Sequence, residues 1–150
     1  MSFNPYGDRN KEELETPDWL FADLDAEFAF NLDPCASDLN HKCDIYFTKA
    51  EDGLKQDWGG RRAFVNPPYG RNIEKWVAKA LLEALRGTTV VLLLPSRTGT
   101  RWWHDLIWDR EKKCPRPWAE VRFLKGRLTF KGEPAPAKFD SVVVVFRKWP

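Results

Sequence analysis

The chain has 150 residues, 43% of them hydrophobic and 14% aromatic, with 9 glycines and 11 prolines. This composition is typical of one soluble folded domain and excludes a disordered chain, a collagen and a repeat array. The formal net charge of +2 conceals an asymmetry, because residues 1–60 carry 5 Lys and Arg against 14 Asp and Glu, whereas residues 61–150 carry 19 against 8. The basic part predicts a face for a polyanion such as a nucleic acid, unless the charge is simply solvated surface that is unevenly spread.

The start of the chain predicts a flexible arm followed by a helix. Residues 1–15 show no hydrophobic period, so the single folded domain is expected over residues 16–150. Thr16 and Pro17 are typical of the N-cap and the first position of a helix. Apolar residues at helical spacing extend this helix to position 27 or 28.

Three short strands are predicted next. The apolar stretch Phe28–Leu32 ends in Asp33-Pro34, which places an acid at the carboxyl end of the strand. A weaker strand is expected over Ile45–Phe47. The third strand, Arg62–Val65, is stopped by Asn66-Pro67-Pro68, because consecutive prolines cannot continue a ladder.

The middle of the chain predicts a strand-helix-strand unit. From Asn72, apolar residues follow the i, i+3, i+4, i+7 spacing of a helix until Gly87, a typical C-cap residue. The apolar, β-branched run Thr88–Leu94 follows directly and predicts a strand buried on both faces of a parallel sheet.

The last part predicts one more helix and a strand-rich end. Thr100 can cap a helix that holds Trp103, Leu106 and Ile107. A loop at Cys114–Trp118 and three strands at Val121–Leu124, Leu128–Phe130 and Ser141–Phe146 complete the chain. The expected fold is a three-layer α/β domain whose sheet is mostly parallel, with antiparallel edge strands.

The sequence also predicts a cytoplasmic protein that does not enter a membrane. The longest apolar run, Val90–Leu94, is too short to span a bilayer, and the polar N-terminus is unlike a signal peptide. An odd number of cysteines, Cys35, Cys43 and Cys114, gives no disulfide framework. Together with His41 these cysteines match no usual zinc spacing, so no metal is expected.

The most informative motif is Asn66-Pro67-Pro68-Tyr69, placed between a strand and a long helix, where open α/β sheets bind ligands. Two prolines fix the backbone and present two acceptors, the Asn66 side chain and the Pro67 carbonyl, beside an aromatic ring. An amino group with two N–H donors would satisfy both acceptors. The alternative interpretation is a stiff turn that ends the strand.

With this motif, the chain resembles the adenine-specific DNA methyltransferases, most closely the phage-type DNA N6-adenine methyltransferase (Dam) family. The resemblance covers roughly residues 16–147. In that family a (D/N/S)PP(Y/F/W) motif binds the target amino group. Other similar stretches are TPDWLF at Thr16–Phe21, NLDPCAS at Asn31–Ser37, LLLPSRT at Leu92–Thr98 and FLKGRLTF at Phe123–Phe130.

The resemblance implies a minimal, Rossmann-like, S-adenosylmethionine-dependent enzyme that methylates the N6 amino group of adenine in DNA. Asn66 and the carbonyl of Pro67, held rigid by Pro68, are implied to accept hydrogen bonds from that amino group, while Tyr69 stacks on the extruded base. These acceptors return electron density to the nitrogen, which attacks the methyl group directly, without a metal or a covalent enzyme intermediate. Protection from restriction is one biological role that this activity can serve.

The resemblance also implies a cofactor site in the acidic part of the chain. Thr16-Pro17 resembles the family motif that holds the methionine carboxylate of the cofactor. The run Asp33-Pro34-Cys35-Ala36 resembles the family's LDPxxGxG motif, in which the acid contacts the cofactor, although neither glycine is present here. Asp52 is a further candidate. An excess of acid suits a cationic ligand.

DNA is the expected partner, and phosphate contacts are expected from the basic segment 97–131, in which four tryptophans are interleaved. Trp103, Leu106 and Ile107 form a helical stripe, so some of these tryptophans are expected in the core instead. The predicted DNA-binding residues are Arg97, Arg101, Lys112, Lys113, Arg116, Lys125 and Arg127. The chain has no room for a separate target-recognition insert, so recognition is expected to be short or loose, or to involve a homodimer.

Three other interpretations stay open at this point. Enzymes that methylate a glutamine amide in proteins share the NPPY motif, and RNA adenine is a further substrate that composition does not separate from DNA. The missing glycines also fit a nucleic-acid-binding module that binds no cofactor and has no activity.

Overall fold

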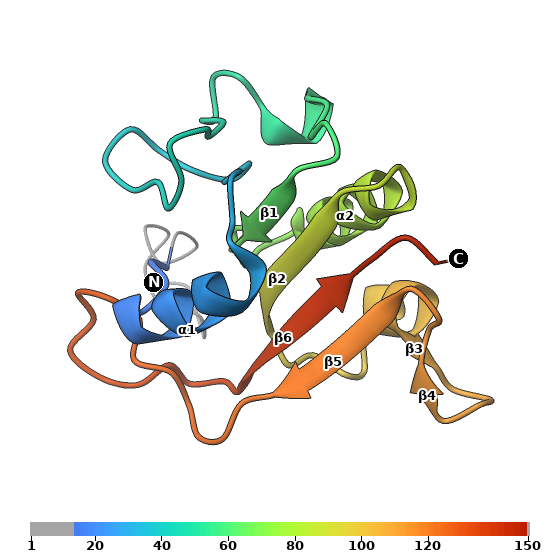
Figure 1. Cartoon of the computed structure of the whole chain (residues 1–150). Coiled ribbons are helices and arrows are strands. Elements are labelled where there is room, and N and C mark those ends of the chain that lie inside the picture. Colours follow the sequence, from blue (N-terminus) through green and yellow to red (C-terminus); the bar gives the residue numbers. More distant parts are fainter. Residues whose placement is uncertain (1–13, 150) are drawn as a thin grey trace.

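A four-stranded sheet in the order β1-β2-β6-β5 forms the centre of the computed structural model, which describes residues 14–149 (Figure 1). Strand β1 (Arg62–Val65) pairs in parallel with β2 (Thr89–Pro95). Strand β6 (Ser141–Phe146) lies between β2 and β5 (Ala119–Phe123) and is antiparallel to both. The predicted flexible arm falls largely on residues 1–13, which lie outside the described part of the chain.

The sheet is mixed, so the expectation of a mostly parallel sheet is wrong for the named strands. Because the apolar residues of β6 are all buried, this strand takes an interior place in the sheet and contributes two antiparallel pairings. The antiparallel edge strand was predicted and is present as β5. Beyond β1, two isolated parallel bridges, Leu32 to Ala63 and Asp33 to Tyr46, take the place of the strands predicted over Phe28–Leu32 and Ile45–Phe47.

Helix α1 (Asp18–Phe28) confirms the first predicted helix, but its start differs by one residue. Pro17 occupies the N-cap position and no side chain caps the helix, so the prediction of Thr16 as the N-cap is wrong. The helix ends at Ala29, which has a left-handed φ of 51°. This turn removes Phe28 from the predicted strand and directs the chain toward the bridge at Leu32.

Helix α2 (Ile73–Leu85) confirms the most regular pattern in the sequence. Its predicted apolar stripe is buried and packs on β2 and β6. Gly87 follows the helix with a φ of 112°, a conformation that residues with a Cβ rarely adopt. The strand-helix-strand unit β1-α2-β2 is therefore present, and it places the Asn66 motif between β1 and α2.

The segment after β2 departs from the prediction in two places. The expected helix is a short π-helix, η3 (Trp103–Ile107), which leads into a small hairpin of β3 (Trp108–Asp109) and β4 (Cys114–Pro115). The loop predicted to begin at Cys114 therefore starts with a strand. The strand predicted over 128–130 is irregular chain, although its apolar side chains Leu128 and Phe130 are buried.

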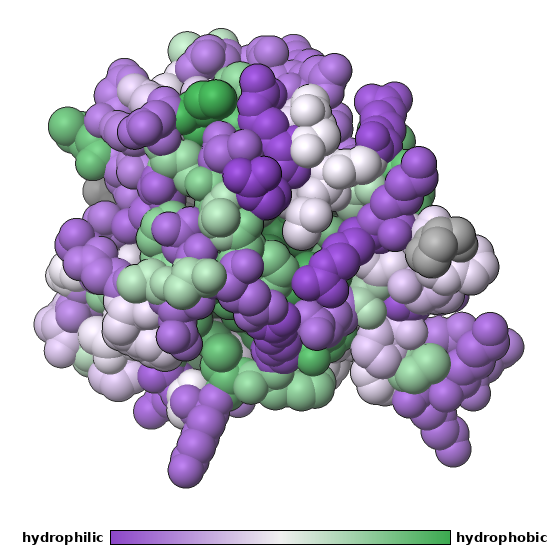
Figure 2. All heavy atoms as spheres, in the orientation of Figure 1, coloured by the Kyte–Doolittle hydropathy of each residue, from purple (hydrophilic) through white to green (hydrophobic). Residues whose placement is uncertain are grey.

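The molecular surface is mostly hydrophilic on the face seen in Figure 2, and hydrophilic side chains project from it over the β3–β4 hairpin. Among the described residues, no helix is both long and apolar enough to cross a bilayer.

Candidate functional site

A cavity of about 640 Å³ lies where the chain leaves β1, next to the bridge at Asp33. Its size is within the range of small-molecule and cofactor sites. Four segments contribute to its walls: the chain before α1, the stretch after Asp33, the 3-10 helix η2 (Gly53–Lys55), and the junction of β1 with α2. The lining residues include Leu14, Thr16, Asp33, Cys35, Ala36, Lys42, Phe47, Asp52, Leu54, Asn66, Pro68, Asn72 and Trp76.

Asp33 places a buried carboxylate on the wall of this cavity, with only 4% of the residue exposed. One carboxylate oxygen accepts a hydrogen bond from the backbone N–H of Cys35 at 3.3 Å, and the other accepts from that of Lys42 at 2.9 Å. Burial raises the pKa of Asp33 to about 6, against the opposing effect of these two hydrogen bonds. Above that pH the cavity therefore holds a negative charge that is fixed in position and shielded from water.

A second acidic wall packs directly against the first. The Asp52 carboxylate accepts from the backbone N–H of Leu54 at 3.1 Å and so caps η2. The next residue, Gly53, lies so close to the chain that a Cβ there would overlap the carbonyl oxygen of Pro34. A glycine is therefore required at this contact. The family's LDPxxGxG motif would place its glycines shortly after Asp33, whereas this glycine belongs to the segment at Gly53.

The side chain of Asn66 is held in one orientation by the chain that precedes α1. Its Nδ2 group donates to the backbone oxygen of Leu14 and, at 3.0 Å, to the hydroxyl of Thr16. Both N–H donors of the carboxamide are thereby used. The Oδ1 atom of Asn66 is consequently the acceptor left on a residue that lines the cavity.

Tyr69 does not line the cavity, and the expectation of an accessible aromatic face is wrong for this structure. The residue is 6% exposed, and its hydroxyl donates to the backbone oxygen of Leu93 at 2.9 Å. Its ring contacts Phe130 and Phe139 edge to face, at centroid distances of 6.2 and 5.7 Å. Burial raises the pKa of the Tyr69 hydroxyl well above its usual range.

The structure brings together most of the residues predicted for the cofactor and the target amino group. Thr16, Asp33, Cys35, Ala36 and Asp52 all line the cavity, together with Asn66 and Pro68. Pro17, Pro34 and Pro67 are buried beside these residues and do not line it.

Sequence reasoning missed the apolar part of the wall, to which Phe47, Leu54 and Trp76 contribute. Trp76 lies on the buried stripe of α2, where its spacing predicts an ordinary core residue. Trp76 lies in the first turn of the helix that follows the Asn66 motif, and this position could have indicated that it lines the site.

The model of the family described as DNA N-6-adenine-methyltransferase (Dam) matches residues 6–149, nearly the whole chain. The chain belongs to the Dam family. A DNA N-6-adenine-methyltransferase of Haemophilus phage HP1 (strain HP1c1) is 34% identical over 96 residues, which are 62% of this chain and 55% of that protein. A DNA N-6-adenine-methyltransferase of Escherichia phage T1 is 29% identical over 158 aligned positions, covering 94% of this chain and 65% of that protein. The Dam-family chain thus spans less than two thirds of the length of either relative.

The predicted DNA-binding residues of this Dam-family chain differ in exposure and in the contacts they make. Lys112 and Lys113 are exposed in the turn of the β3–β4 hairpin, beside Arg110. Arg116 instead braces the hairpin, because its guanidinium donates to the backbone oxygen of His104 at 2.8 Å and lies 4.0 Å from the Asp109 carboxylate. Of the other predicted DNA-binding residues, Arg101, Lys125 and Arg127 are exposed and Arg97 is half-buried.

The tryptophans of the basic segment belong mostly to the interior. Trp102 and Trp103 are both buried, and Trp103 belongs to the predicted helical stripe. The indole N–H of Trp118 donates to the backbone oxygen of Leu106 at 2.8 Å. These three side chains stabilise the segment that carries the basic hairpin.

The cysteines form no disulfide, and no group of three potential metal ligands occurs within residues 14–149. Cys43 is buried, and burial raises the pKa of its thiol to about 12. Cys114 is exposed in the hairpin, far from the other two in the sequence.

Proposed function

We propose that this chain transfers a methyl group from S-adenosylmethionine to the N6 amino group of adenine in DNA. The single observation that carries the proposal is the Asn66 carboxamide, whose two N–H donors are bonded to Leu14 and Thr16, so that its oxygen serves as an acceptor on the cavity wall. Membership of the Dam family, and the names of the two phage relatives, support the reaction and the base.

The residues of the cavity fit S-adenosylmethionine in size, charge and polarity. When bound, this cofactor supplies an electrophilic methyl group on a positively charged sulfur. The buried carboxylate of Asp33 favours such a cation, and Phe47, Leu54 and Trp76 offer an apolar surface to an aromatic base. The Thr16 hydroxyl accepts from Asn66 and still has its own proton to donate to the cofactor.

We propose that the chain activates the target nitrogen by accepting hydrogen bonds from its two N–H groups. An exocyclic amino group is a poor nucleophile because its lone pair is delocalised into the ring. Acceptors at Asn66 Oδ1 and at the Pro67 carbonyl draw its N–H bonds out of the ring plane, and electron density then returns to the nitrogen. Because the Asn66 carboxamide is already held in this orientation, no free energy is needed to turn it at the moment of reaction.

In the described state the Tyr69 ring is packed against Phe130 and Phe139. We therefore propose that stacking of an extruded adenine on Tyr69, which the family resemblance implies, requires the segment around residues 130–139 to separate from the ring.

We also place the fold among the three-layer, Rossmann-like methyltransferases. Helix α2 covers β2 and β6, and aromatic contacts from Phe28 through Phe30 link α1 to Phe64 of β1.

The test is a transfer assay with unmethylated DNA and S-adenosylmethionine, followed by digestion to nucleosides and mass analysis. Wild type is expected to produce N6-methyladenine. Asn66→Ala is expected to lower kcat by at least about 100-fold, as when a preorganised polar contact to a transition state is removed. Asn31→Ala is the control, because the Asn31 carboxamide also bonds to the backbone of a distant segment, by accepting from the N–H of Arg62 at 2.8 Å, but Asn31 is not among the cavity residues.

Each contrary result has a defined meaning. Retention of the wild-type rate by Asn66→Ala would show that the carboxamide does not act on the base. N4-methylcytosine as product would keep the site and refute the base. Methylation of RNA, or of a glutamine peptide, in place of DNA would refute the substrate class.

A further inference from the structure

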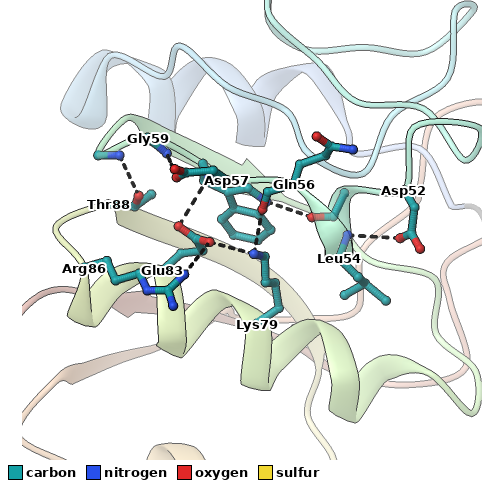
Figure 3. A network of polar contacts seen from close by, with 12 residues as sticks. Asp52, Leu54, Gln56, Asp57, Gly59, Lys79, Glu83, Arg86 and Thr88 are labelled. Atoms are coloured by element: carbon teal, nitrogen blue, oxygen red, sulfur yellow. Dashed lines mark hydrogen bonds and ion pairs between the residues drawn. The ribbon is translucent and has the colours of Figure 1, made fainter.

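Glu83 is a buried carboxylate on α2 that the proposed reaction does not use. The residue is 1% exposed and is absent from the cavity lining. Its Oε2 atom accepts from the backbone N–H of Trp58 at 3.3 Å, and its Oε1 atom accepts from Lys79 Nζ at 2.6 Å (Figure 3). A charge placed this deeply is costly unless it is paired and hydrogen-bonded, so these contacts are strong constraints on the groups they join.

Lys79 extends the same network to the chain that precedes β1. Its Nζ group donates to the backbone oxygen of Gln56 at 2.6 Å and lies 5.6 Å from the ring centroid of Trp58. Trp58 is fully buried, and its indole N–H donates to the backbone oxygen of Gly53 at 2.9 Å. Gln56 and Trp58 are therefore bonded to α2, and the Trp58 indole links Gly53 to the same network (Figure 3).

The start of this segment forms part of one wall of the cavity. Asp52, Gly53 and Leu54 line the cavity, and Gly53 touches the carbonyl of Pro34, next to the buried carboxylate of Asp33. The separation of the two acidic walls thus depends on where residues 53–58 are held. The groups that hold them, Glu83 and Lys79, lie behind the wall and outside the cavity.

We propose that Glu83 and Lys79 are positioning residues for the cofactor site, acting through Trp58 and Gln56 on the wall formed by Asp52 to Leu54. The inference rests on the proposed function, because it takes the cavity to be the S-adenosylmethionine site. It differs from a simple structural role in that loss of Lys79 loosens the wall and weakens cofactor binding, while the transfer step at saturating cofactor is unaffected.

Arg86 provides a matched control on the same carboxylate. Its guanidinium lies 3.9 Å from Glu83 Oε1, and its side chain is 63% exposed (Figure 3). Removing Arg86 therefore takes away one cation paired with Glu83 and leaves the bonds from Lys79 to Gln56 and from Glu83 to Trp58 in place.

The experiment compares Lys79→Met, Lys79→Arg and Arg86→Met by amide hydrogen exchange over residues 52–60, by calorimetric titration with S-adenosylmethionine and by steady-state kinetics. Lys79→Met is expected to speed exchange in the wall and to raise both Kd and KM for S-adenosylmethionine by about tenfold, with kcat within about twofold of wild type. Lys79→Arg is expected to recover most of the affinity, and Arg86→Met is expected to match wild type. Glu83→Gln is a second variant. If Glu83→Gln does not fold, the result for Lys79→Met decides the test.

The outcomes separate the two proposals. If wild type binds S-adenosylmethionine and Lys79→Met behaves like Arg86→Met, the positioning role is wrong and the proposed function stands. A fall in kcat with unchanged Kd would also overturn the positioning role. If wild type shows no binding, the proposed function fails, and the positioning role fails with it, because the wall then serves no cofactor.

Discussion

At the scale of single residues, the Asn66 carboxamide shows how a motif acquires a direction. Amide oxygen and nitrogen have the same size, so the motif alone leaves open which of them faces a ligand. The bonds from Nδ2 to Leu14 and Thr16 decide the question in favour of the oxygen as acceptor. A segment about 50 residues before the motif is therefore needed to set up this acceptor.

Asp33 predicts a pH dependence for both stability and binding. Its pKa is raised from 3.8 to about 6 in the folded protein, so between these values the folded state binds more protons than the unfolded state. The free energy of unfolding consequently falls as pH rises through this window and is constant above it. A cation bound beside the ionised carboxylate offsets that loss, and its affinity rises over the same window.

We expect the affinity for S-adenosylmethionine to increase by about tenfold between pH 5 and pH 7 through this group, measured by calorimetric titration. Asp33→Asn is expected to bind weakly and with a flat pH profile. Asp38→Asn is the control, because the Asp38 carboxylate is exposed on the same cavity. An equally steep profile in Asp33→Asn would show that another group governs the dependence.

The sequence predicts Asp33 and Asn66 because both follow directly on short apolar stretches, a local relation that spacing reveals. It fails for Tyr69, whose aromatic contacts Phe130 and Phe139 come from a distant part of the chain. Glu83 was missed for the same reason. Its partner Trp58 lies 25 positions away, and nothing in the helical pattern of α2 distinguishes a buried glutamate from a surface one.

At the scale of elements, predictability follows the length and regularity of the pattern. Helix α2 and strand β2 each carry a long hydrophobic period, and their bounds were predicted closely. The bridges at Leu32 and Asp33 depend on pairing with separate segments, and the order of β6 and β5 depends on which strand is more apolar across the whole sheet. The spacing of apolar residues within one segment does not predict which other segment it will pair with.

The β3–β4 hairpin predicts a salt-dependent contribution to DNA binding. Lys112 and Lys113 are exposed in its turn, where Lys113 adopts a left-handed φ of 57°. Each lysine that neutralises a phosphate releases condensed counterions, which makes log K depend on log salt with a slope of about −0.9 per contact. Replacing both lysines by Gln is expected to weaken binding to all DNA sequences and to reduce the magnitude of this slope by about 2.

The measurement is a fluorescence-anisotropy titration of labelled duplex DNA at several salt concentrations. Lys75→Gln combined with Arg86→Gln removes the same number of exposed charges from α2 and is expected to leave the slope unchanged. If the two double variants lose DNA affinity equally, the hairpin makes no specific contribution and the affinity depends only on the net charge of the protein.

At the scale of the whole molecule, the charge asymmetry of the sequence corresponds to two kinds of surface. The acidic part contributes Asp33, Asp38 and Asp52 to the cavity, while the basic part contributes the exposed hairpin and the segment after β5. An acidic cavity suits a cationic cofactor, and a basic exterior suits a nucleic acid. The glycine-poor motif at Asp33 is compatible with this division, because Gly53 provides the close approach at that wall.

Thermal unfolding with and without S-adenosylmethionine tests this division in the intact protein. A ligand at 100 times its Kd stabilises the folded state that binds it by about 2.7 kcal/mol. For a chain of this size we expect that stabilisation to raise the Tm by about 5–10 °C. The shift is expected to shrink sharply in Asp33→Asn and to persist in the hairpin double variant, because only the first change affects the cavity. Stabilisation by DNA without any stabilisation by saturating S-adenosylmethionine would identify a nucleic-acid-binding module that has lost the cofactor.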